Sequence, residues 1–162
     1  MNKTETNKTR GALPRLTVAA IIPQTATNQN TQFLMVKEKK QGQLVLNQPA
    51  GHVENFESLT QAIEREVREE TGWKVKAEYL LGLYSFTAEN GTETYHRACF
   101  ICSPIAQVSD DIDKEISEAV WLTKEQILNQ NRRSPLVEKC LEDYLAGTIY
   151  PLSLICDKHL LT

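Results

Sequence analysis

The sequence has no segment that would place the chain in or across a membrane. Its apolar runs all fall short of the roughly 18 residues needed to cross a bilayer. The opening "MNKTETNKTRG" lacks the apolar core of a secretory signal peptide. We therefore expect a cytoplasmic protein that has no membrane partner.

The chain also lacks an excess of positive charge. Its 162 residues include 18 lysines and arginines against 21 aspartates and glutamates, which gives a net charge of −3. Binding to a nucleic-acid backbone depends on clustered cations, so the composition argues against nucleic acid as a partner. A content of 41% hydrophobic and 24% charged residues is typical of a globular domain.

The arrangement of the cysteines predicts neither a disulfide framework nor a complete zinc site. The four cysteines are expected to be free thiols in a reducing compartment. The stretch "CFIC" (99–102) has the spacing of half a zinc site, but no second pair and no nearby histidine completes it. The chemistry of this chain must therefore come from other side chains.

Composition along the chain indicates one domain behind a short tail. Residues 1–13 are polar and show no periodicity, which predicts a flexible N-terminal tail. A single domain is then expected over residues 14–162, a length sufficient for one hydrophobic core.

Apolar runs bounded by turn residues predict the strands. Residues 15–22 and 32–38 are expected to pair as a hairpin, and Asn90-Gly91 predicts a tight turn between two further long strands. Another strand is predicted at 116–122, and helices follow it. This order of strands, helix, strands and helices predicts an α/β fold in which a mixed sheet lies between helices.

The stretch "GHVENFESLTQAIEREVREETGW" (51–73) contains the most informative helix. Ser58 and Gln61 form a capping-box pair, and Gly72 stands where a left-handed stop is expected. These signals predict a helix over residues 59–71.

The buried face of this helix can be read at about 100° per residue. With Glu66 set at zero, Glu69 lies at about −60° and Glu70 at about 40°. The apolar residues that define the core-facing stripe lie in the same sector: Leu59, Ala62, Ile63 and Val67. We therefore expect all three carboxylates to continue the buried stripe, although a solvated face is the usual explanation of such a charge run.

Three inward-facing carboxylates need a cation. Glu66 and Glu70 are like charges at i,i+4 and repel one another. Arg65 can reach Glu69, but one guanidinium does not neutralise three carboxylates. A divalent cation can, because Mg²⁺ prefers hard oxygen ligands and commonly shares its shell between carboxylates and substrate phosphates. The pattern predicts a metal site that activates water toward a phosphate compound.

The same residues carry a resemblance to a known family. The pattern Gly-x5-Glu-x7-Arg-Glu-apolar-x-Glu-Glu-x-Gly-apolar is met by Gly51, Glu57, Arg65, Glu66, Val67, Glu69, Glu70, Gly72 and Trp73. This resembles the signature of Nudix hydrolases, and Trp73 is bulkier than the usual aliphatic residue. The resemblance implies an α/β/α sandwich and water attack on a phosphorus of a diphosphate.

Roles follow from the resemblance by position. Glu66, Glu69 and Glu70 would bind Mg²⁺, or Mn²⁺ in its place, with the carbonyl of Gly51 as a further candidate ligand. Glu57 would lie beside the cluster, where it would either bind a second metal ion or hold a water. Arg65 would orient the glutamates by ion pairing.

The general base is Glu66 as first choice, or a carboxylate outside the motif, for which Glu115 and Glu118 are the candidates. Arg97 would touch a substrate phosphate or else face solvent from its strand. His52 would contact the ligand or lie in a turn.

Flanking segments narrow the resemblance. "LNQPAGHVE" (46–54), "SEAVWL" (117–122) and "RSPLVEKCLEDYLAGTIYPLSLI" (133–155) resemble the NudJ-type branch of the family. That likeness implies small pyrophosphates such as thiamine pyrophosphate and hydroxymethylpyrimidine pyrophosphate, or nucleoside di- and triphosphates. The alternatives are a nucleotide-sanitising or dinucleotide-polyphosphate hydrolase, or a non-catalytic binding module; a monomer and a homodimer are both compatible.

Overall fold

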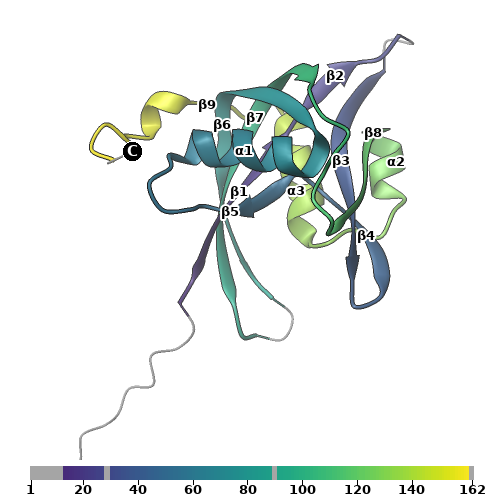
Figure 1. The fold of residues 1–162 in the computed structure, drawn as a ribbon, viewed down its shortest axis with the longest axis horizontal. Coiled ribbons are helices and arrows are strands. Elements are labelled where there is room, and N and C mark those ends of the chain that lie inside the picture. Colours follow the sequence, from purple (N-terminus) through teal and green to yellow (C-terminus); the bar gives the residue numbers. More distant parts are fainter. Residues whose placement is uncertain (1–12, 28–29, 89–90, 161–162) are drawn as a thin grey trace, which may run out of the picture.

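A computed structural model describes residues 13–27, 30–88 and 91–160 (Figure 1). The predicted tail therefore lies, except for Leu13, outside the described residues. The elements are β1 (Arg15–Ile21), β2 (Pro23–Thr25), β3 (Thr31–Lys40), β4 (Gln43–Asn47), β5 (Ala50–His52), α1 (Leu59–Thr71), β6 (Trp73–Thr87), β7 (Thr94–Gln107), β8 (Ile116–Thr123), α2 (Lys124–Leu128), α3 (Pro135–Leu145), β9 (Tyr150–Pro151) and a 3₁₀ turn, η1 (Leu152–Leu154).

The larger sheet is mixed and has the strand order β5-β1-β7-β6-β9. Strands β1 and β7 are parallel, whereas β5, β6 and β9 each pair antiparallel with their neighbours. The predicted pairing of the long strands β6 and β7 is confirmed, and it extends from Trp73↔Gln107 to Thr87↔Thr94. Of the Asn-Gly turn predicted between them, Asn90 lies outside the described residues and Gly91 has φ 66°.

The smaller sheet contains β2, β3 and β4, and β8 pairs with β3 on the other side. The hairpin predicted between residues 15–22 and 32–38 forms only at its inner end, where the Leu34 amide donates to the Ile22 carbonyl at 3.1 Å. Along the rest of its length β1 pairs with β5 and β7 instead. Only the short strand β2 turns back onto β3. The apolar pattern indicated the two strands, but it does not encode which neighbour each one selects.

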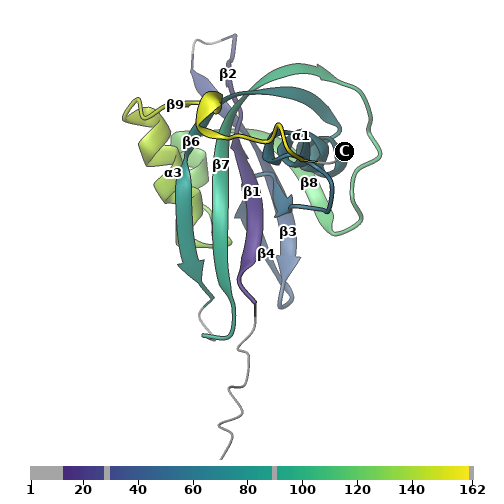
Figure 2. The same cartoon turned by 90° about the vertical axis from the view of Figure 1, so that its left-hand side faces the viewer.

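Helices α1 and α3 cover opposite faces of the larger sheet (Figure 2). Val18 and Ala20 of β1 pack with Ile63 of α1, while Ala19 and Ile21, which point the other way, belong to the cluster that contains α3. Because β1 is buried on both faces, its sequence is almost wholly apolar. The predicted α/β class, with a mixed sheet between helices, is confirmed. No helix within the described ranges is long and apolar enough to cross a membrane.

Candidate active site

Helix α1 begins and ends where the sequence predicts. The Ser58 hydroxyl accepts a hydrogen bond from the Gln61 amide at 3.2 Å, and the Gln61 side chain accepts one from the Ser58 amide at 2.7 Å. At the other end Gly72 has φ 71°, and its amide donates to the Arg68 carbonyl at 2.9 Å. A Cβ at Gly72 would also overlap the Ser109 carbonyl, so glycine is required there for two reasons.

The three glutamates of α1 differ in exposure. The Glu66 side chain is 13% exposed and Glu70 is partly buried, but the Glu69 side chain is 52% exposed. The expectation that all three continue the buried stripe is therefore wrong for Glu69. At about −60° this residue lies at the margin of the stripe, where its carboxylate reaches solvent.

Arg65 connects four parts of the site. It binds both oxygens of Glu57, with Nε–Oε2 at 3.0 Å and Nη2–Oε1 at 2.7 Å. Its Nη1 donates to Glu66 Oε1 at 2.8 Å and to Glu69 Oε2 at 3.0 Å, which confirms the predicted i,i+4 pair. Its Nη2 also donates to the His52 carbonyl at 3.0 Å. One guanidinium thus orients Glu57, Glu66 and Glu69 together and lowers the pKa of Glu57.

Strand β5 lies directly against the glutamates of α1. The Ala50 amide donates to Glu70 Oε2 at 2.9 Å. The next residue, Gly51, leaves no space for a side chain, because a Cβ there would overlap the Glu66 carboxyl group. The backbone of β5 and the last two turns of α1 therefore enclose the carboxylates of Glu66 and Glu70 between them.

Burial and like charges act together on Glu70. Burial raises the pKa of Glu70 to about 8, and the negative charges of Glu66, Glu38 and Asp113 act in the same direction against the Ala50 hydrogen bond. Burial also raises the pKa of Glu66, although Arg65 opposes that shift. A bound cation would relieve this accumulation of negative charge.

A strand, a loop and a helix that present these carboxylates match one family. The NUDIX domain model matches residues 14–143. The chain belongs to the Nudix family. Phosphatase NudJ of Escherichia coli (strain K12) is 33% identical over 147 residues, which cover 89% of this chain and 92% of that protein. The expected family and enzyme class, a Nudix hydrolase, are thereby confirmed.

Solved structures show the same fold. A NUDIX hydrolase from Nitrosomonas europaea is 39% identical, with a TM-score of 0.82 over 89% of this chain and 97% of that one. The NUDIX domain of Shewanella oneidensis NrtR, solved with ADP ribose, is 16% identical, with a TM-score of 0.70 over 84% of this chain and 89% of that one. At that identity the second likeness concerns the fold alone.

The oxygen donors of this Nudix domain fit a hard dication in their chemistry. Carboxylates and a backbone carbonyl are the ligands that Mg²⁺ prefers. In the part of the chain that the structure describes, however, no three acidic, histidine or cysteine side chains converge closely enough to enclose an ion. Glu57, Glu66 and Glu69 instead form ion pairs with Arg65 at 2.7, 2.8 and 3.0 Å.

The candidates for a base outside the motif lie differently. Glu115 is exposed, and its amide donates to Asp113 Oδ1 at 3.3 Å. Glu118 forms an ion pair with Lys37 across β8 and β3 at 2.7 Å. Asp113 is the loop carboxylate whose charge acts on Glu70, and its amide donates to the Glu69 carbonyl at 2.8 Å.

The two predicted substrate residues also have defined surroundings. Arg97 is partly buried, and its Nε and Nη1 are closed off from solvent without a hydrogen-bond partner in the described ranges. The alternative of a solvent-facing arginine is therefore wrong. His52 lies in β5 rather than in a turn, and it is exposed. Its carbonyl, which the sequence did not single out, holds Arg65.

The shifted pKa of Glu70 predicts how stability depends on pH in EDTA. The folded-state value of about 8 exceeds the ordinary 4.5, so the folded protein holds this proton more tightly than the unfolded chain. This contribution to the free energy of unfolding is fully present below about pH 4.5 and is lost as the pH rises to about 8. The free energy of unfolding falls by up to about 1.4 kcal/mol for each pH unit in this range. Urea unfolding between pH 5 and 8 measures this loss.

The matched variants are Glu70→Gln and Glu64→Gln. Glu70→Gln should reduce the fall in stability, whereas Glu64→Gln on the same helix should leave it unchanged. Identical pH dependence in the wild type and in Glu70→Gln would contradict the assignment.

Proposed function

We propose that this Nudix hydrolase cleaves a phosphoanhydride bond of small pyrophosphates in the cytoplasm. The substrates would be nucleoside di- or triphosphates, or compounds similar to thiamine pyrophosphate and hydroxymethylpyrimidine pyrophosphate. The observation that carries the proposal is the partly buried Glu70 beside Glu66, held against β5, with Arg65 orienting the other carboxylates. The 33% identity to phosphatase NudJ supports the same reaction class.

In this proposal Glu66, Glu69 and Glu70, together with Glu57 and the Gly51 carbonyl, hold Mg²⁺ or Mn²⁺. The ion, when bound, supplies Lewis-acid polarisation of the phosphate and neutralises its charge. Binding requires Glu57, Glu66 and Glu69 to share their oxygens between the ion and Arg65, whose five N–H donors keep them in place.

The remaining roles belong to side chains that act on water and substrate. Glu66 is the proposed general base, because its carboxylate lies against β5 and is oriented by the 2.8 Å hydrogen bond from Arg65. Glu115 is the alternative base. Arg97 is proposed to bind a substrate phosphate, since it has enclosed N–H groups with no partner among the described residues. His52 would lie at the outer edge of the same site.

Removing the metal tests this function. With EDTA, we expect release of phosphate from thiamine pyrophosphate and nucleoside triphosphates to fall to background, and added Mg²⁺ to restore it. The panel should also include ADP-ribose and diadenosine polyphosphates, which represent the alternative substrate classes. Undiminished turnover in EDTA would contradict the metal assignment. Metal binding without turnover on any compound would favour a non-catalytic module.

A further inference from the structure

The turn between β4 and β5 determines where β5 lies against the glutamates of α1. Residues 48 and 49 alone separate β4, in the smaller sheet, from β5, in the larger one. Ala50 and Gly51 follow the turn directly; the first donates its amide to Glu70, and the backbone of the second approaches Glu66. A shift of this turn would therefore disturb both contacts at once.

Hydrogen bonds hold the turn at each position. Gln48 is fully buried, and its Nε2 donates to the Ala20 carbonyl at 3.4 Å. The Pro49 carbonyl accepts a hydrogen bond from the Ala20 amide at 3.0 Å. These two bonds tie the turn to β1, whereas its connection to the smaller sheet depends on the side chain of Asn47.

The buried side-chain amide of Asn47 uses both of its ends. Its Oδ1 accepts a hydrogen bond from the Gln48 amide at 3.0 Å, and its Nδ2 donates to Glu38 Oε1 at 3.0 Å. A backbone amide only donates and an ionised carboxylate only accepts, so the two partners fix which way the Asn47 amide points. An aspartate in this place could form the first bond but not the second.

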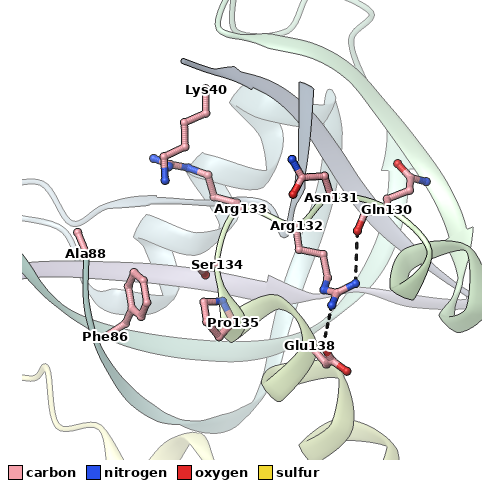
Figure 3. Close-up of a pocket in the computed structure, with 10 residues that line it drawn as sticks. All are labelled: Lys40, Phe86, Ala88, Gln130, Asn131, Arg132, Arg133, Ser134, Pro135 and Glu138. Carbon is pink, nitrogen blue, oxygen red and sulfur yellow. Dashed lines mark hydrogen bonds and ion pairs between the residues drawn. The ribbon is translucent and has the colours of Figure 1, made fainter. Parts of the chain in front are cut away.

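Glu38 is the point at which three segments meet. It lies on β3, next to β4, and the same oxygen that binds Asn47 contacts Arg133 Nε at 3.2 Å. Arg133 comes from the segment before α3, and Figure 3 shows it extending toward Lys40 at the end of β3. Its amide also donates to the Leu46 carbonyl at 2.8 Å. Asn47 is thereby bound to a carboxylate that is itself held in place.

We infer that Asn47 is a positioning residue for the metal-binding carboxylates. Its contact with Glu38 fixes the turn, and the turn presents the Ala50 amide to Glu70 and the Gly51 carbonyl to the ion. This inference rests on the proposed function, because it concerns the same metal site. Groups that orient metal ligands typically affect metal affinity or activity by 10- to 100-fold, although they do not touch the ion.

Asn47→Asp tests the inference in the metal-free protein. It keeps the size of the side chain but sets a carboxylate against Glu38, so the contact that fixes the turn is lost. In EDTA we expect the Ala50 amide to exchange its hydrogen at least about 5-fold faster relative to the Ala77 amide, as measured by NMR. The Ala77 amide is the internal reference, because it donates to Glu64 on the same helix and would follow any general loss of stability.

Exchanging the two groups should restore the contact. Asn47→Asp combined with Glu38→Gln places the amide on β3 and the carboxylate on β4, with the same volumes and net charge as in the wild type. We expect this double variant to recover most of the slow exchange at Ala50. Glu38→Gln alone should leave that exchange close to the wild type, because the glutamine oxygen still accepts from Asn47. A role in packing alone predicts no such rescue.

Metal binding gives a second measurement. The affinity for Mn²⁺ alone, followed by electron paramagnetic resonance, should fall by about 10-fold or more in Asn47→Asp and recover in the double variant. Asn129→Asp, which adds the same charge at an exposed position after α2, should bind Mn²⁺ like the wild type. Asn47→Ala adds no charge and carries the same expectations for exchange and affinity should Asn47→Asp fail to fold. Unchanged Ala50 exchange in a folded Asn47 variant, or no recovery in the double variant, would overturn the inference.

The two proposals fail separately. If Ala50 exchange and Mn²⁺ affinity respond as expected but no pyrophosphate is hydrolysed, the proposed function fails and the role of Asn47 stands. If hydrolysis is metal-dependent but Asn47→Asp leaves both measurements unchanged, the role of Asn47 fails alone.

Discussion

Glu70→Gln is expected to lower kcat for phosphoanhydride hydrolysis by at least about 100-fold at saturating Mg²⁺. The substitution removes one negative charge and little else, because the glutamine side-chain oxygen can still accept the hydrogen bond that Ala50 donates to Glu70 at 2.9 Å. Loss of activity would then reflect a lost metal ligand rather than a lost contact with β5. Steady-state release of phosphate across a Mg²⁺ titration measures it.

Glu64→Gln is the control for this change. It lies on the same helix and removes the same charge, but its carboxylate accepts a hydrogen bond from the Ala77 amide, away from the site. Its kcat should remain within a factor of about two of the wild type.

Glu70→Gln should also melt at a higher temperature than the wild type in EDTA at pH 8, because the neutral amide removes repulsion with Glu66. Hydrolysis that survives Glu70→Gln unaltered would refute the assigned metal site.

Much of α1 was predictable because its signals are local. The capping box of Ser58 and Gln61 and the left-handed Gly72 act within one turn of the chain, so they set both ends of the helix without any tertiary contact. The Arg65–Glu69 pair is equally local. Glu69 shows the limit of this approach. Its angle around the helix axis does not reveal how far the neighbouring elements cover α1, so the exposure of its side chain was not predicted.

The contributions from distant segments could not be predicted from the sequence. Glu38 on β3 and Asp113 in the loop before β8 act on Glu70 only because the fold brings three segments together. Strand partners were inaccessible for the same reason, as the pairing of β1 with β7 shows. An isolated arginine such as Arg97 carries no sign of its burial, because strand periodicity identifies a face but not what covers it.

Gly51→Ala is expected to reduce kcat by at least about 10-fold with little loss of stability. Gly51 does not have a positive φ, so the backbone accepts alanine without strain. The added methyl group would instead overlap the Glu66 carboxyl group, which is the far end of a flexible side chain and can rotate away. Rotation breaks the 2.8 Å bond to Arg65 and displaces the proposed base and metal ligand. Initial rates and thermal melts measure the two effects.

A double substitution isolates the cause. If the methyl group acts by displacing the Glu66 carboxyl group, Gly51→Ala should cost almost nothing further in Glu66→Ala, in either activity or melting temperature. Gly82→Ala is the control for the type of change, because Gly82 also lacks a positive φ and the three atoms nearest to its Cβ would all belong to Tyr84, the nearest at 3.1 Å. Fully additive losses in the double variant, or an undiminished kcat in Gly51→Ala, would show that close approach of β5 to Glu66 does not position the carboxylate.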